Sequence, residues 1–193
     1  MNVVRCAIPD LLLLEPKVFP DNRGDFLETY NERTFSQAGL SARFVQDNLS
    51  TSKRHVVRGL HYQIRQSQGK LVQVVYGEIL DVAVDLRRRS PAFGRHLALR
   101  LRDREHKAFW IPPGFAHGFL VLSEIACVAY KTTDFYAPEF ERTLLWNDPA
   151  LGIDWPVKPE EAVLSEKDRQ GLVLSKAEVF EDQLSAIAVE KRR

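Results

Sequence analysis

The chain contains little cysteine, little methionine and no excess charge of either sign. Among its 193 residues there are two cysteines and one methionine, and the formal net charge is +1. Cys6 and Cys127 have no metal-ligand spacing, and the apolar run around Cys127 favours a small buried thiol. A nearly neutral chain has no global field that would direct it to nucleic acid or a membrane surface. An anionic ligand must therefore be held by a local cluster of cations.

Long apolar runs are also absent from the sequence. Near the N-terminus the strongest run is Leu11–Leu14, which is too short for the hydrophobic part of a signal peptide. No segment approaches the length of a transmembrane helix. These features predict a cytoplasmic protein with neither a membrane nor a nucleic acid as its partner.

What the sequence does contain is a series of short β-type runs, separated by turn residues such as Pro112-Pro113-Gly114. Many short strands at this spacing predict an all-β sandwich or barrel. The length suits one domain over residues 1–193. Strands are expected at Phe26–Tyr30, Phe44–Leu49, Val56–Gln63, Leu71–Tyr76, Ile79–Leu86, His96–Leu101, Ala108–Ile111, Gly118–Leu122, Val128–Thr133 and Thr143–Trp146.

Two segments have the pattern of a helix. Asn31 is a suitable N-cap for a short helix that extends to Ala38. Ser175 and Glu178 form a capping-box pattern, which predicts a C-terminal helix with a frayed charged end within residues 175–193. The apolar residues that follow this box at helical spacing are Phe180, Leu184 and Ile187.

Three segments carry side chains suited to chemistry: His61-Tyr62-Gln63, Pro112 to His117, and Ser165 to Asp168. Each is a weak signal by itself. A lone strand histidine is usually structural, Pro-Pro-Gly is usually a turn, and Ser165 with Asp168 equally predicts the start of a helix. Their combination is what calls for a functional explanation.

The pattern Pro112-x-Gly114-x-x-His117 resembles the second motif of the cupin fold, which implies a jelly-roll barrel. The first cupin motif offers H-x-H on one strand, so that both imidazoles face inward and bind a metal. Here Gln63 replaces the second histidine, and an amide is a poor ligand for a transition metal. We therefore expect no metal and no cofactor. A metal-dependent oxygenase would need a second strand histidine near His61, and His55 lies six residues before it.

Asp81 and Asp85 in the run Asp81-x-x-x-Asp85 invite a metal-binding or acid–base interpretation. We prefer a structural one, in which these carboxylates lie at turns and strand edges and bond to backbone groups or nearby arginines. The same run alternates apolar with other residues, which indicates a strand with one face in a core.

A longer set of spaced motifs resembles one family, the dTDP-4-dehydrorhamnose 3,5-epimerases. The resemblance runs in order from Asp21 to Asp168 and so covers most of the chain. Its motifs are Asp21-Asn22-Arg23-Gly24-x-Phe26-x-Glu28, Val45-Gln46-Asp47-Asn48-x-Ser50, Arg58 to Gln63, Lys70-Leu71-Val72, Gly77 to Arg87, Ser90-Pro91-x-Phe93-Gly94, Ala116-His117-Gly118-Phe119, Tyr130-Lys131, Trp146-Asn147-Asp148-Pro149 and Leu164-Ser165-x-Lys167-Asp168.

The resemblance implies proton transfer next to the keto group of a dTDP-linked 4-keto-6-deoxyhexose. Epimerisation of such a carbon needs a base, a group that stabilises the enolate and an acid on the opposite face. His61 matches the family's base, since imidazole titrates near pH ~6.5, and Asp168 matches its orienting partner. Tyr130 matches the acid, although the sequence does not separate it from Tyr136. Lys70 matches the enolate stabiliser; the alternative is an ordinary solvated lysine.

The resemblance also implies a set of substrate-binding residues. Arg23 and Arg58 are the best candidates for the diphosphate, because guanidinium binds phosphate through paired donors. The other expected contacts comprise amides, aromatic rings, carboxylates, a histidine and a lysine: Phe26, Glu28, Gln46, Asn48, His117, Tyr136, Glu141 and Lys167.

Alternative functions remain open at this point. One is an epimerase of a single carbon or a keto-sugar isomerase on the same scaffold. Another is a non-catalytic cupin that binds nucleotide sugars, which predicts the loss of His61, Tyr130 or Asp168; all three are present. Members of the family are homodimers that exchange N-terminal strands, which implies that Arg23 and Glu28 reach the partner's site.

Overall fold

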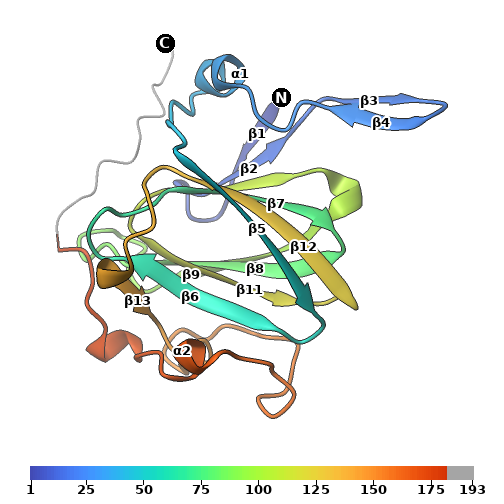
Figure 1. Cartoon of the computed structure of the whole chain (residues 1–193). Coiled ribbons are helices and arrows are strands. Elements are labelled where there is room, and N and C mark those ends of the chain that lie inside the picture. Colours follow the sequence, from blue (N-terminus) through green and yellow to red (C-terminus); the bar gives the residue numbers. More distant parts are fainter. Residues whose placement is uncertain (182–193) are drawn as a thin grey trace.

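The computed structural model describes residues 1–181, and most of its regular structure is β-strand. Two antiparallel sheets face each other, as Figure 1 shows. The order of the six-stranded sheet is β1-β2-β10-β7-β12-β5, and that of the five-stranded sheet is β13-β6-β11-β8-β9. This arrangement confirms the prediction of an all-β sandwich.

The strands of the middle of the chain lie within a few residues of the predicted runs, whereas β1, β2 and β3 were not predicted. The six-stranded sheet contains β1 (Asn2–Arg5), β2 (Leu12–Glu15), β10 (Ala108–Ile111), β7 (Lys70–Tyr76), β12 (Ile125–Thr132) and β5 (Gln46–Lys53). The five-stranded sheet contains β13 (Glu141–Thr143), β6 (Val57–Gln63), β11 (Phe115–Val121), β8 (Glu78–Asp85) and β9 (His96–Arg102). A separate hairpin is formed by β3 (Val18–Asp21) and β4 (Gly24–Leu27).

The space between the two sheets is apolar over most of its length. Side chains of both sheets alternate between this interior and the outside, since successive residues of a strand point to opposite faces. Val72, Phe109, Phe119 and Val128 are among the buried residues of this interior cluster. One end of the interior is polar instead, and this end forms the site described below.

Strand β8 is buried on both faces, not on one. Its residues Val82 and Val84 pack outward against a second cluster, while Ala83 packs inward. The outward cluster is covered by the segment after β13, which contributes Trp146 and Phe180. The alternation predicted the Val82 and Val84 face to lie in a core, and a layer that is distant in sequence covers that face. The opposite face, which was not predicted to be buried, packs inward between the two sheets through Ala83.

The first predicted helix is confirmed as α1 (Glu32–Gln37). The Asn31 side chain accepts hydrogen bonds from the backbone N–H groups of Arg33 and Thr34, at 3.0 and 3.2 Å. Gly39 follows with a φ of +91°, a conformation that glycine adopts without strain. The helix buries Phe35 against the outer face of the six-stranded sheet.

The second predicted helix is wrong for the residues that the structure describes. Leu174–Lys176 is a single 3₁₀ turn, η3, and the chain after Ala177 is extended. The Glu178 carboxylate binds Arg142 at 2.9 Å and so caps no helix. Phe180 exchanges backbone hydrogen bonds with Leu86 and Arg88. Docking of Phe180 on the sheet outweighs the local capping pattern; residues 182–193 lie outside the described residues.

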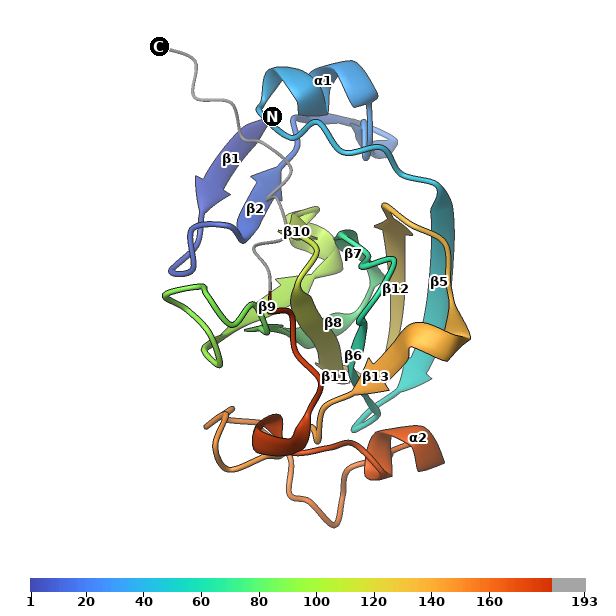
Figure 2. The same cartoon turned by 90° about the vertical axis from the view of Figure 1, so that its left-hand side faces the viewer.

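The remaining regular elements are short, and they are α2 (Glu166–Arg169), η1 (Asp103–Glu105) and η2 (Pro138–Phe140). Helices α1 and α2 lie at opposite ends of the molecule in both Figure 1 and Figure 2. Within residues 1–181, no helix has the length and apolar character needed to cross a membrane.

Candidate active site

A pocket of about 370 Å³ opens at the polar end of the interior, between β5, β7 and β12 of one sheet and β6 and β11 of the other. Most of the predicted site residues line it. Those that do are Gln46, Asn48, Arg58, His61, Lys70, His117, Tyr130, Tyr136, Glu141 and Lys167.

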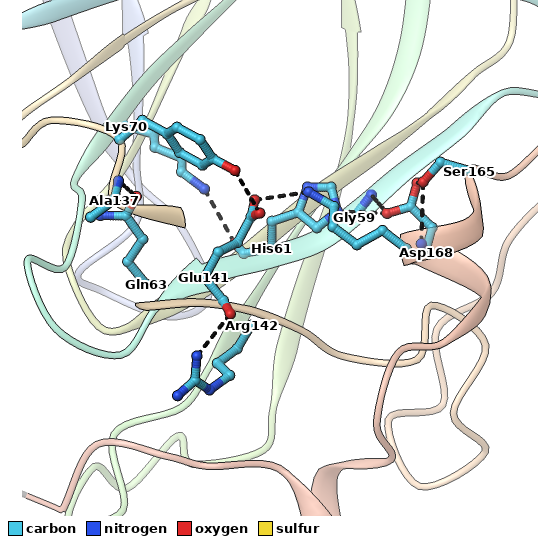
Figure 3. A network of polar contacts seen from close by, with 11 residues as sticks. Gly59, His61, Gln63, Lys70, Ala137, Glu141, Arg142, Ser165 and Asp168 are labelled. Carbon is cyan, nitrogen blue, oxygen red and sulfur yellow. Dashed lines mark hydrogen bonds and ion pairs between the residues drawn. The ribbon is translucent and has the colours of Figure 1, made fainter. Parts of the chain in front are cut away.

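His61 and Asp168 form a close pair at this pocket. His61 comes from β6, and its Nε2 lies 2.5 Å from Oδ1 of Asp168, which is the one buried residue of α2. The Ser165 hydroxyl donates to the other carboxylate oxygen of Asp168 at 2.6 Å, and the Gly59 N–H donates to Oδ1 at 3.4 Å. Figure 3 shows this arrangement. Ser165 also caps α2, so this segment is both a helix start and the support of the carboxylate that pairs with His61.

Burial and hydrogen bonding shift the pKa values of His61 and Asp168 in opposite directions. Desolvation lowers the pKa of His61 below its ordinary 6.5, and the hydrogen bond with Asp168 opposes this shift only in part. Burial raises the pKa of Asp168, but the hydrogen bonds from His61 and Ser165 outweigh it, so this pKa lies below its ordinary 3.8. At neutral pH the pair is thus a neutral imidazole beside a carboxylate, which is a competent base.

Lys70 lies inside the pocket and is not a solvated surface lysine. Its side chain comes from the start of β7, only 8% of the residue is exposed, and Nζ donates to the His61 carbonyl at 3.2 Å. Burial lowers the Lys70 pKa from 10.5 to about 8, although Glu141 and Asp81 oppose this effect. Lys70 therefore still carries its charge at neutral pH.

The two candidate tyrosines differ in what their hydroxyl groups contact. Tyr136 donates its hydroxyl to Glu141 Oε2 at 2.9 Å. Tyr130 points from β12 into the interior, and no hydrogen bond within residues 1–181 occupies its hydroxyl. Burial raises the pKa of Tyr130 above its ordinary 10, with Arg58 opposing it. Tyr130 is thus a protonated phenol that faces the pocket, which favours it over Tyr136 as the acid.

Glu141 connects two further pocket residues. Its Oε1 accepts from Lys167 Nζ at 2.9 Å, and its other oxygen accepts from Tyr136. Burial raises the Glu141 pKa, but the bonds from Lys167 and Tyr136 outweigh this effect and keep it below its ordinary 4.5. Since Lys167 adjoins Asp168, helix α2 contributes to the pocket rim and to the His61 pair at once.

His117 belongs to a second pair of histidine and carboxylate. Its Nε2 lies 3.0 Å from both oxygens of Asp81, a β8 residue with 0% exposure. The expectation that Asp81 bonds to backbone or arginine is therefore wrong, because β8 directs Asp81 inward beside β11. The expectation holds for Asp85, whose carboxylate binds Arg87 at 2.6 Å.

Gln63 has a structural role in the position where a cupin places its second histidine ligand. Its amide nitrogen donates to the carbonyls of Gln66 and Phe135, at 2.8 and 3.2 Å. Its amide oxygen accepts from the Ala137 N–H at 2.9 Å, and Figure 3 shows this last bond. Within the described part of the chain, no three His, Cys, Asp or Glu residues are grouped as metal ligands.

Four predicted site residues are not in the lining of this pocket: Asp168, which contacts it through His61, and three residues that lie away from it. Arg23, Phe26 and Glu28 belong to the β3–β4 hairpin and the residue just after it, and the hairpin projects from the body in Figure 1. Arg23 pairs with Asp21 at 2.5 Å, and Phe26 is 71% exposed. The structure therefore does not bring these residues to the pocket of their own chain.

Sequence reasoning missed several residues that support the pocket. Ser165 and Gly59 hold Asp168, Asp81 holds His117, and the buried Ser52 accepts from Arg58 Nε at 2.8 Å. Inward alternation along β5 would have placed Ser52 on the pocket face. The others depend on contacts between segments that are distant in sequence.

Comparison with known proteins identifies the family to which this chain is similar. Residues 5–176 match the family described as dTDP-4-dehydrorhamnose 3,5-epimerase. A protein of that name from Pseudomonas aeruginosa is 58% identical over 93% of this chain and 99% of its own length. The namesake from Salmonella typhimurium is 50% identical over 92% of this chain and 97% of its own length.

Solved structures show the same similarity. The epimerase of Legionella pneumophila, in complex with dTDP-4-keto-L-rhamnose, superposes with a TM-score of 0.91 at 45% identity, covering 95% of this chain and 99% of its own. A 3'-monoepimerase from Streptomyces bikiniensis, in complex with dTDP-quinovose, has a TM-score of 0.82 at 33% identity, covering 88% of this chain and 86% of its own. The chain belongs to the dTDP-4-dehydrorhamnose 3,5-epimerase family.

Proposed function

We propose that this protein is an isomerase that inverts C3 and C5 of dTDP-4-keto-6-deoxy-D-glucose and so produces dTDP-4-keto-L-rhamnose. Membership of the family supports the reaction, and the ligand bound to the Legionella pneumophila relative supports the substrate class. The observation that carries the proposal is that His61 and Tyr130 project into one pocket from facing sheets.

The facing arrangement matches what inversion of a carbon requires. His61 stands on β6 of the five-stranded sheet and Tyr130 on β12 of the six-stranded sheet. A sugar ring between them meets the base on one face and the acid on the other. His61 removes a proton next to the keto group, Asp168 stabilises the imidazolium that forms, and Tyr130 returns a proton to the opposite face.

The enolate formed in between needs a cation near its oxygen. Lys70 is buried and charged, and a fixed charge in a site with little water stabilises developing negative charge strongly. Its bond to the His61 carbonyl keeps it beside the base. The pocket therefore supplies all three parts of a proton-transfer epimerase: base, enolate stabiliser and acid.

The rest of the pocket is suited to the other parts of the substrate. We assign Arg58 to the diphosphate, and Tyr136 to the thymine ring. The remaining contacts with sugar and nucleotide are assigned to Gln46, Asn48, His117, Glu141 and Lys167, all of which line the pocket.

We also propose a homodimer in which the projecting hairpin completes the partner's pocket. Arg23, Phe26 and Glu28 match family positions that contact substrate, yet they lie outside the pocket of their own chain. Exchange of this arm between two copies would reconcile the two facts. A cytoplasmic location agrees with two free cysteines, Cys6 and Cys127.

The experiment that tests the function is proton NMR of dTDP-4-keto-6-deoxy-D-glucose incubated with the enzyme in D₂O. Deuterium at both C3 and C5, with the L-rhamno product, is the expected result. Exchange at one carbon alone would instead favour a monoepimerase like the Streptomyces bikiniensis relative, which is the second candidate function. Binding without exchange would indicate a non-catalytic protein, and His61→Ala serves as the inactive control.

A further inference from the structure

Arg58 differs from the other cations of the pocket in its partners. Lys167 is paired with Glu141 at 2.9 Å, and Lys70 donates to the His61 carbonyl. Arg58 uses only its Nε, which donates to Ser52 Oγ at 2.8 Å. Within residues 1–181, no hydrogen bond or ion pair occupies its Nη1 and Nη2. The N–H groups of Nη1 and Nη2, which can donate in parallel, thus remain for an anion.

Ser52 is well placed to fix the direction of these donors. It is only 6% exposed and lies on the inward face of β5, while Arg58 comes from β6 of the facing sheet. A guanidinium is planar, so a bond at Nε restricts the orientation of the whole group. The Nη edge that remains is the one that binds phosphate oxygens in pairs.

An arginine without this bond would be more mobile. Arg58 reaches the pocket from an exposed position, and a long side chain loses rotamer entropy when it is immobilised. A bond that restrains the side chain before the ligand arrives moves part of this cost out of the binding step.

We propose that Ser52 is a positioning residue that holds Arg58 in the orientation that receives the diphosphate of the nucleotide sugar. This inference rests on the proposed function, because it takes a nucleoside diphosphate group as the ligand. Ser52 itself is not among the residues that line the pocket, so we expect its removal to weaken binding and to leave the chemical step intact.

The test is a double-mutant cycle with dTDP as the probe, measured by isothermal titration calorimetry on the full-length protein. We expect Ser52→Ala to raise the Kd for dTDP roughly five- to tenfold, and Arg58→Ala to raise it about a hundredfold. In the Arg58→Ala background, Ser52→Ala should have no further effect, since it acts only through that guanidinium. In turnover, Ser52→Ala should raise KM and leave kcat unchanged.

Matched variants separate this effect from a general loss of structure. Thr51→Ala removes the neighbouring hydroxyl, which lies on the exposed face of β5 near Cys127, and should leave the Kd for dTDP unchanged. Ser52→Thr keeps the hydroxyl and should retain most of the affinity. Ser52→Cys keeps the volume but offers only a weak acceptor, so it should behave like Ser52→Ala.

Two results would overturn the inference. The first is a wild-type Kd for dTDP in folded Ser52→Ala and Ser52→Cys. The second is an effect of Ser52→Ala that persists at full size when Arg58 is absent. Failure of the proposed function is read separately, from the wild-type protein: its substrate would exchange protons at one carbon or at none, whatever the Kd of the Ser52 variants for dTDP.

Discussion

Replacement of Asp168 by asparagine tests the role of the negative charge. The neighbours of this side chain determine whether the amide oxygen or the amide nitrogen faces His61. In the wild type, Oδ1 faces His61 Nε2 and the Gly59 N–H, while Oδ2 faces the Ser165 hydroxyl. The Gly59 N–H can only donate, so it selects the amide oxygen on its side. The Ser165 hydroxyl can rotate and accept from the amide nitrogen. In Asp168→Asn the amide oxygen should therefore face His61 and accept its hydrogen bond.

The expected loss of activity follows from this orientation. The variant retains the correct tautomer of His61 and loses only the negative charge that stabilises the imidazolium. Since a hydrogen bond to a charged group contributes about 1.5–3 kcal/mol, kcat should fall roughly 10- to 100-fold. An amide that turned its nitrogen to His61 would instead fix the wrong tautomer, and losses of that kind reach about 10⁴-fold.

The pH profile gives an independent measure of the same charge. Burial lowers the pKa of His61 and Asp168 opposes the shift, so loss of the charge should lower this pKa further. Because the base must be neutral, the acidic limb of kcat/KM should move to lower pH in Asp168→Asn. Deuterium exchange followed by NMR over a pH series measures both quantities.

A matched control uses another buried carboxylate. Asp148 is 5% exposed and accepts from the backbone N–H groups of Ala150 and Leu174, away from the pocket lining. Asp148→Asn should affect thermal stability and leave kcat and its pH profile unchanged. An acidic limb that stays in place or rises in Asp168→Asn would refute the assigned role of Asp168.

The remaining predictions concern other parts of the pocket. The Lys70 pKa of about 8 predicts that kcat/KM falls as pH rises through 8, and Lys70→Arg should remove this alkaline limb, as a pH–rate series would show. Tyr130→Phe should slow inversion more than deuterium exchange at C3 and C5; an equal decrease in both would exclude a dedicated acid. Gly118→Ala would place a Cβ 2.5 Å from the Arg58 carbonyl, so calorimetry should find the folded state destabilised by about 1–3 kcal/mol. Chelator treatment followed by metal analysis should leave activity intact, because Gln63 is committed to three backbone groups.

The predicted part of the fold is the part whose strands show local alternation and clear turns. Strand β2 was missed because its pairing with a strand that is distant in sequence decides its conformation, and β1 pairs with β2 at the edge of the same sheet. Leu12 of β2, for example, pairs with Trp110 of β10. The C-terminal helix failed for the opposite reason, since a good local pattern at Ser175 was overridden by burial of Phe180. Tertiary contacts thus account for both kinds of error.

The sequence motifs predicted which residues belong to the candidate site, but not how these residues contact one another. Motifs identify His61 and Asp168 as candidates, but their pairing joins residues that are 107 positions apart. The carboxylate of Asp81 was misjudged because nothing in its own strand distinguishes an inward partner of His117 from an edge carboxylate. The direction of a side chain in a sandwich depends on the register and on the layer that covers the strand, and neither is a local property.

Register also explains why the two histidines of the pocket have different surroundings. His61 and His117 are direct partners across β6 and β11, yet their carboxylates come from different parts of the fold. Asp81 lies on β8, the strand next to the central strand β11, whereas Asp168 lies in the segment that covers the outer face of the sheet. The His117 pair is therefore set by the sheet itself. The His61 pair depends on how residues 146–180 pack against that sheet, so the pKa of the proposed base is coupled to the packing of the covering layer.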